Sequence, residues 1–176
     1  MKKGSIGATL CHESVLAAAV MISLVGLQPG SPAAAQQSGQ GKLLMEVSAR
    51  LALLIGKANQ AGYEIQDNKA AVGGAYLTPG LTQGEKDKAW TPLLTVSLDA
   101  GKKYRFLAAG DDNAKDVDLE IHDPKGKLLA ADVGKEADAI VDFTPKVAGK
   151  YTVRVRLFES KQNMSCLCMA IVMREK

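Results

Sequence analysis

The feature that most constrains the fold is a series of short segments, from Pro92 to Met173, in which apolar and polar residues alternate. Residues 116–122 are Asp-Val-Asp-Leu-Glu-Ile-His, and residues 151–157 are Tyr-Thr-Val-Arg-Val-Arg-Leu. Successive side chains of a β-strand point to opposite faces of a sheet, so a period of two places one face of each strand in a core. The other predicted strands are residues 93–98, 104–109, 127–132, 139–143 and 166–173. Short strands separated by Gly, Pro and Asp turns predict an antiparallel β-sandwich. One of these turns, at residues 123–126, has Pro at its second position and Gly at its fourth, as a type I turn prefers.

The residues before this β region predict a single helix. Between residues 43 and 60, apolar side chains recur at spacings of three and four, which is the period of an amphipathic helix. Gly62 follows as a helix-ending glycine. The predicted apolar stripe comprises Leu44, Val47, Leu51, Leu54, Ile55 and Ala58. We therefore expect a mainly β fold, a jelly-roll-like antiparallel sandwich with one N-terminal amphipathic α-helix.

The N-terminus predicts export. Lys2 and Lys3 precede an apolar run at 15–27, and small residues lead to a cleavage site near Ala35. The run is short of the roughly 20 apolar residues that span a bilayer. We expect residues 1–35 to be a signal peptide, and the mature chain to have no transmembrane segment and to be periplasmic or secreted.

The predicted organisation after the signal peptide has three parts. Residues 36–42 are a polar linker, residues 43–91 hold the helix and a turn-rich connection with one short strand near residues 74–77, and residues 92–176 are the sandwich. The chain carries 22 Lys and Arg against 19 Asp and Glu, a formal net charge of +3. Opposite charges are interspersed and no basic stripe with aromatics occurs, so the composition indicates no nucleic-acid partner.

Residues 92–158 resemble the bacterial pre-peptidase C-terminal domain family. The resemblance rests on Gly101, Tyr104, Asp116, Asp118, Leu119, Asp123, Gly126, Thr144, Pro145, Gly149, Tyr151 and Val155. It implies a jelly-roll-like β-sandwich of the kind that serves as an accessory module on secreted bacterial enzymes, some of which bind calcium or an extracellular polymer. Two departures stand out, because no peptidase domain precedes the module and the helix is not part of the usual unit. We expect a stand-alone version.

The acidic segment at 111–118 is a candidate calcium site. An EF-hand is excluded, because neither Asp111 nor Asp116 starts a loop with glycine at position 6 and glutamate at position 12. Carboxylates could still converge at an edge of the sandwich. The candidate ligands are Asp111, Asp112, Asn113, Asp116 and Asp118. The alternative is a solvent-facing stripe of Asp116, Asp118, Glu120 and His122, paired with Arg105, Arg154 or Arg156 on other strands.

The sequence supports catalysis less well than it supports binding. His122 is the single histidine of the mature chain, and the sequence has neither G-x-S-x-G nor H-E-x-x-H. A hydrolase would have to use His122 with nearby carboxylates. We expect no enzyme activity and no resident cofactor other than possible calcium.

The segment Met164-Ser-Cys166-Leu-Cys168-Met169 leaves several alternatives. Cys166 and Cys168 share a face of one strand, and they could be buried and inert, form a strained disulfide, or pair between chains. The M-x-C-x-C-M pattern would also suit Cu(I). Separately, Tyr63, Tyr76 and Trp90 could line a carbohydrate-binding surface or pin loops onto the core.

The combined expectation is a non-catalytic, exported binding or structural module. It would act through its surface on a protein or polysaccharide partner in the cell envelope or outside the cell. Metal binding, by calcium at 111–118 or by Cu(I) at 164–169, is the alternative, and a hydrolase is the second alternative.

Overall fold

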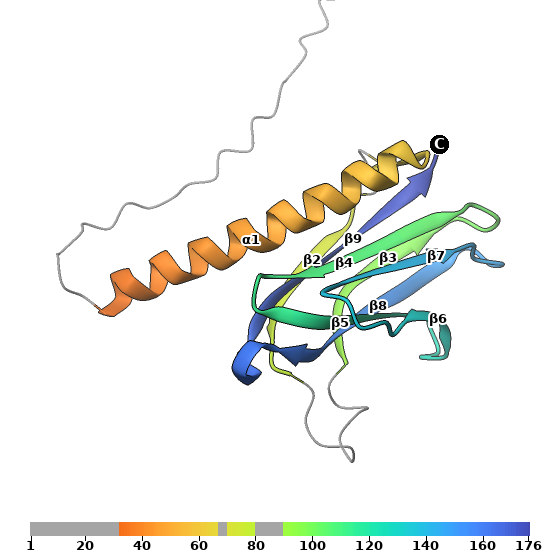
Figure 1. Cartoon of the computed structure of the whole chain (residues 1–176). Helices are drawn as coiled ribbons and strands as arrows, with labels where there is room; N and C mark the ends of the chain where they lie inside the picture. The colour runs from red at the N-terminus through yellow and green to blue at the C-terminus, as the bar shows by residue number, and fades with distance from the viewer. Residues whose placement is uncertain (1–31, 67–69, 80–89) are drawn as a thin grey trace, which may run out of the picture. The chain divides into compact units, whose positions relative to one another are not determined.

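The computed structural model describes residues 32–66, 70–79 and 90–176, which form a long helix and two antiparallel β-sheets (Figure 1). Sheet A has the strand order β1-β9-β4-β7, and β2 also pairs with β9. Sheet B has the order β3-β8-β5-β6. The bounds are α1 Pro32–Gln60, β1 Tyr63–Glu64, β2 Val72–Leu77, β3 Thr91–Leu98, β4 Tyr104–Gly110, β5 Ala114–His122, β6 Leu128–Asp132, β7 Asp138–Phe143, β8 Gly149–Ser160, a 3₁₀ turn at Lys161–Asn163, and β9 Cys166–Glu175.

The mainly β fold with one helix is confirmed, and each predicted strand is present. The predicted turn at 123–126 joins β5 to β6 as a hairpin within sheet B. The connections from β3 to β4 and from β7 to β8 instead pass between the sheets, because each joins strands that belong to different sheets. Strand β1 is too short for any periodicity to reveal it.

Two of the predicted boundaries are wrong. Residues 36–42 are part of α1 and not a linker. Pro32 suits the first turn of a helix, where its missing N–H costs nothing. A helix that is already formed extends without a new nucleation cost, which offsets the roughly 1 kcal/mol that Gly39 and Gly41 each cost relative to alanine. The division at residue 92 is also misplaced, because β2 lies in sheet A beside β9. Residues 1–31 of the predicted signal peptide lie outside the described residues.

The main core lies between the two sheets. Val117, Leu119 and Ile121 of β5 point into it, as their alternation predicts, and so do alternate residues of β8. The β8 residues are Tyr151, Val153, Val155 and Leu157. Burying a side chain of this size stabilises a fold by about 1.5–3 kcal/mol. The alternating residues therefore decide which faces of the two sheets meet.

A second core lies between α1 and the outer face of sheet A. Val47, Leu51, Leu54 and Ala58 of the helix pack on Leu107, Ala109, Ile171 and Met173 from β4 and β9. Both faces of β4 are thus covered, which explains why its sequence Phe-Leu-Ala-Ala is apolar without a break. Leu44, which the helical stripe also included, is 50% exposed, because it lies before the part of α1 that contacts the sheet. No helix within the described ranges is long and apolar enough to cross a membrane.

Candidate binding cleft

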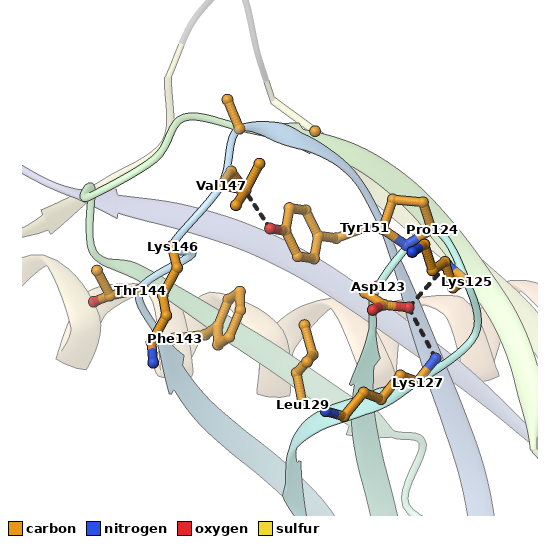
Figure 2. Close-up of a pocket in the computed structure, with 12 residues that line it drawn as sticks. Asp123, Pro124, Lys125, Lys127, Leu129, Phe143, Thr144, Lys146, Val147 and Tyr151 are labelled. Carbon is orange, nitrogen blue, oxygen red and sulfur yellow. Dashed lines mark hydrogen bonds between the residues drawn. The ribbon is translucent and has the colours of Figure 1, made fainter.

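A cleft of about 640 Å³ opens where the β5–β6 turn, β6, the end of β7 and the β7–β8 loop come together (Figure 2). Its lining residues are Asp123, Pro124, Lys125, Lys127, Leu129, Phe143, Thr144, Lys146, Val147, Ala148, Gly149 and Tyr151. A volume of this size is within the range of small-molecule and peptide side-chain sites.

The turn on one side of the cleft is fixed by Asp123. Its Oδ1 accepts hydrogen bonds from the backbone N–H groups of Lys125 (2.8 Å) and Lys127 (2.9 Å), and its carbonyl accepts one from Gly126 (2.9 Å). The hydrogen bond from the backbone of Lys127, followed by that from Lys125, holds the pKa of the Asp123 carboxyl below its usual value. Gly126 has a φ of 80°, which glycine adopts without strain. Asp123 is therefore committed to the turn, and it presents the two lysines at the cleft.

The floor of the cleft is apolar. Phe143 and Tyr151 pack edge to face, with ring centroids 5.6 Å apart at 61°. The hydroxyl of Tyr151 donates to the carbonyl of Val147 at 2.6 Å, which ties the β7–β8 loop to β8 (Figure 2). Leu129 is 39% exposed and lies at an irregularity of register, since Ile121 pairs with Ala130 and His122 with Leu128. A bulge of this kind re-aims one side chain.

The charge around the cleft is mainly positive. Lys125, Lys127 and Lys146 line it against the single carboxylate of Asp123. None of these lysines forms an ion pair with another residue of the described part of the chain. The lining has no His, Cys or Ser, and its one carboxylate holds the turn. The arrangement therefore suits binding of an anionic group beside an apolar one.

The predicted calcium ligands divide among different tasks. Asp111 is fully buried, and its two carboxylate oxygens accept the backbone N–H groups of Asn113 (2.9 Å) and Leu167 (2.7 Å). Asp112 faces the helix, where its Oδ1 accepts from Arg50 at 3.4 Å. The Asn113 carbonyl accepts the N–H of Lys161 at 2.8 Å. Three of the five candidates therefore stabilise the loop between β4 and β5.

Asp116 and Asp118 lie further along β5. Asp118 accepts from the Nε of Arg156 at 2.8 Å, and Asp116 has a buried Oδ1 with no hydrogen-bond partner among the described residues. Burial raises the pKa of both carboxyls, that of Asp116 to about 6. Within the described ranges, no three His, Cys, Asp or Glu side chains gather as a metal site. The structure does not bring the five residues together, and calcium binding stays a prediction.

The acidic stripe of β5 shares one face, as predicted, but the expectation that it faces water is wrong. Asp116, Asp118 and His122 are 7%, 2% and 8% exposed. Arg156 of β8 lies across this face, pairs with Asp118, and packs on the ring of Trp90 at 4.6 Å. The predicted pairing of an arginine with this stripe is present at Arg156.

His122 is held by both ring nitrogens. Its Nδ1 lies 2.9 Å from the carbonyl oxygen of Gly126, and its Nε2 lies 2.8 Å from Oε2 of Glu120. The ring thus connects β5 to the turn beside the cleft. With both nitrogens engaged and little exposure, His122 is placed as a structural residue.

Cys166 and Cys168 are buried, free and on the same face of β9. Burial raises the pKa of both thiols, that of Cys166 to about 12, so neither ionises readily. This matches the buried, inert alternative. Met169 lies on the opposite face, packed against the helix-side core, and Met164 is in the preceding loop, so the M-x-C-x-C-M residues do not converge.

The predicted aromatic surface is also dispersed. Tyr63 is buried under α1 with the guanidinium of Arg105 4.3 Å from its ring centre, Trp90 packs on Arg156, and Tyr76 is exposed on β2. The cleft residues were not among the predicted site residues. The sequence identifies Asp123 and Gly126 only as turn residues, and nothing in the sequence places Lys146 beside them.

No known family model matches the sequence, and no curated protein matches it. The resemblance to the pre-peptidase C-terminal domain stays a prediction.

Among solved structures, PliG from Aeromonas hydrophila, a periplasmic inhibitor of g-type lysozyme, aligns with a TM-score of 0.39 and 13% identity, over 60% of this chain and 86% of that one. A CBM4 structure aligns at 0.36 and 20%, over 65% and 75%. FlgD from Xanthomonas campestris aligns at 0.32 and 20%, over 48% and 67%. The chain is similar to these proteins only at low TM-scores, which carry no argument about its function.

Proposed function

We propose that the protein is a non-catalytic, exported binding module that takes an anionic group of a protein or polysaccharide partner in the cleft. The carrying observation is the combination of an apolar floor with three lysines that have no ion-pair partner in the described part of the chain. An unpaired lysine beside an apolar surface offers a charge that an acidic partner can neutralise while it buries apolar area.

Rigidity of the walls supports this proposal. The turn at 123–127 is fixed by Asp123, and the β7–β8 loop is fixed by the Tyr151–Val147 hydrogen bond. The backbone of Gly101 also donates to the carbonyl of Pro145 at 2.8 Å, which fastens the loop from its other side. A cleft whose walls are held in this way loses little conformational freedom when a ligand enters.

Calorimetric titration of the exported domain tests the proposal. The ligands are an acidic peptide, a uronate oligosaccharide and a neutral oligosaccharide, and the variant is Lys125→Glu combined with Lys146→Glu. Lys57→Glu, on the exposed surface of α1, is the matched control. We expect saturable binding of an anionic ligand that the cleft variant abolishes and the control retains. Binding that is equal in both variants, or no binding of either anionic ligand, would contradict the proposal.

A further inference from the structure

The cleft lies beside two strand edges that have no further strand paired to them in the described sheets. β6 is the last strand of sheet B, and β7 is the last strand of sheet A. A hydrogen bond ties these edges together, because the N–H of Ile140 donates to Oδ2 of Asp132 at 2.8 Å. Toward the other end of the two strands, Leu129 of β6 and Phe143 of β7 line the cleft. The edges are therefore held together at Asp132 and bordered by a hollow at Leu129 and Phe143.

The edge of β7 presents backbone hydrogen-bonding groups next to this hollow. The N–H of Ile140 points away from β4, since it reaches Asp132 on the other side. Backbone groups of alternate residues in a strand point to the same side, so the N–H and C=O of Asp142 point the same way. Asp142 directly precedes Phe143, a cleft residue. An exposed strand edge of this kind is a template on which an extended chain can pair.

The lining favours a peptide over a sugar. Recognition of sugar hydroxyls needs many hydrogen-bonding side chains, but Asp123 holds the turn and the Tyr151 hydroxyl is bound to Val147. The ring of Phe143 packs against the edge or face of Tyr151 and is not a free platform. What remains is an apolar floor, the hydroxyl of Thr144 and the lysine ammonium groups. These complement apolar and carboxylate side chains.

We propose that the cleft binds an extended peptide segment with alternating acidic and apolar side chains, which adds to the edge of β7 at Asp142. Side chains of an added strand alternate between two faces, so we expect the apolar set to pack on Leu129 and Phe143. The acidic set would lie at the rim of the cleft, within reach of the long, exposed side chains of Lys125 and Lys146. This inference rests on the proposed function and names the partner of the same site.

Fluorescence anisotropy with labelled peptides of alternating Glu and Val tests the pairing. The first comparison uses peptides N-methylated at every second residue, in the two possible phases. We expect one phase to weaken binding at least tenfold, because it removes the backbone donors that face β7, and the other phase to bind as the parent does. Equal affinity of both methylated peptides would overturn strand addition.

The second comparison tests charge and sequence pattern. Lys125→Glu and Lys146→Glu should each weaken the parent peptide about tenfold, and Lys57→Glu should not. A peptide of the same composition with its Glu and Val residues in two blocks should bind at least tenfold more weakly than the alternating one. If the block peptide binds equally well, the cleft recognises only the charge of the peptide, and the inference fails.

The uronate oligosaccharide separates the two levels of the proposal. If it binds in a way that depends on Lys125 and Lys146 while the peptide does not bind, the inference is overturned and the proposed function stands. If neither binds, both fail.

Discussion

Replacing Asp116 by Asn changes how stability depends on pH, and the size of the change follows from the structure. Asp116 is 7% exposed on β5, its Oδ1 has no partner among the described residues, and the negative charge of Asp118 is close by. Burial first, and Asp118 second, raise its pKa from 3.8 to about 6. The folded protein thus binds this proton more tightly than the unfolded chain does.

The sign and magnitude follow from that difference. Between a pH near 4 and a pH near 6 the folded state holds more protons, so stability falls as the pH rises through this window. Each unit of pKa shift is worth about 1.36 kcal/mol. The shift from 3.8 to about 6 therefore lowers the free energy of unfolding by about 3 kcal/mol between acid, where Asp116 is protonated in both states, and neutral pH, where it is ionised in both. Asp116→Asn removes this loss while it keeps the shape of the side chain.

The assay is urea unfolding at several pH values from 3.5 to 8, followed by circular dichroism and by the fluorescence of the single tryptophan. We expect the stability of the variant relative to wild type to rise by about 2–3 kcal/mol between the two ends of this range. Any fixed cost of the Asn side chain is the same at each pH and cancels in the comparison. Parallel curves for variant and wild type would refute the reasoning.

Asp142→Asn is the matched control, because its pKa is shifted the opposite way. The guanidinium of Arg105 donates to both carboxylate oxygens of Asp142 at 2.7 Å and lowers its pKa. The stabilisation by this pair is present at neutral pH and is lost as the pH falls through the lowered pKa. Asp142→Asn should therefore reduce stability at neutral pH and have little effect in acid.

Three further predictions concern the helix, the thiols and calcium. Leu54→Ala should lower the free energy of unfolding by about 2–5 kcal/mol, because Leu54 is buried between α1 and sheet A. Leu53→Ala, on the exposed face of α1, should change it by less than about 0.5 kcal/mol. Chemical denaturation of both variants measures the two effects. Cys166 and Cys168 should resist iodoacetamide in the native protein and react after unfolding, as peptide mass spectrometry would show, and rapid native labelling would contradict their burial. Because the Asp111 carboxylate already accepts two backbone N–H groups, we expect added calcium to leave the melting temperature as it is in chelator, and a clear rise would support the predicted calcium site.

The parts of the fold that the sequence predicts are those decided by neighbours in the chain. The alternation of Val117, Leu119 and Ile121 depends only on strand geometry, and the turn at 123–126 depends on local hydrogen bonds. Both are present as predicted. The end of α1 is also local, since Gly62 follows it with a φ of 90°.

The parts that the sequence does not predict depend on contacts between distant residues. The alternating pattern puts Asp118 on the outer face of β5, but its burial depends on Arg156 from β8 and on Trp90 from before β3. The cleft likewise combines Lys125, from the β5–β6 turn within sheet B, with Lys146, from the loop that joins β7 of sheet A to β8 of sheet B. A single sequence shows the residues but not their proximity.

Nuclear magnetic resonance mapping tests the central claim, that the cleft is the binding site, most directly. The alternating Glu-Val peptide is titrated into isotopically labelled protein, and the amide signals of Leu129, Asp142 and Phe143 are compared with that of Lys57 on α1. We expect saturable shifts at these three positions, no shift at Lys57, and slower hydrogen exchange of the Asp142 amide in the complex. Shifts centred on α1 or on the outer face of sheet B, with the cleft signals unchanged, would contradict it.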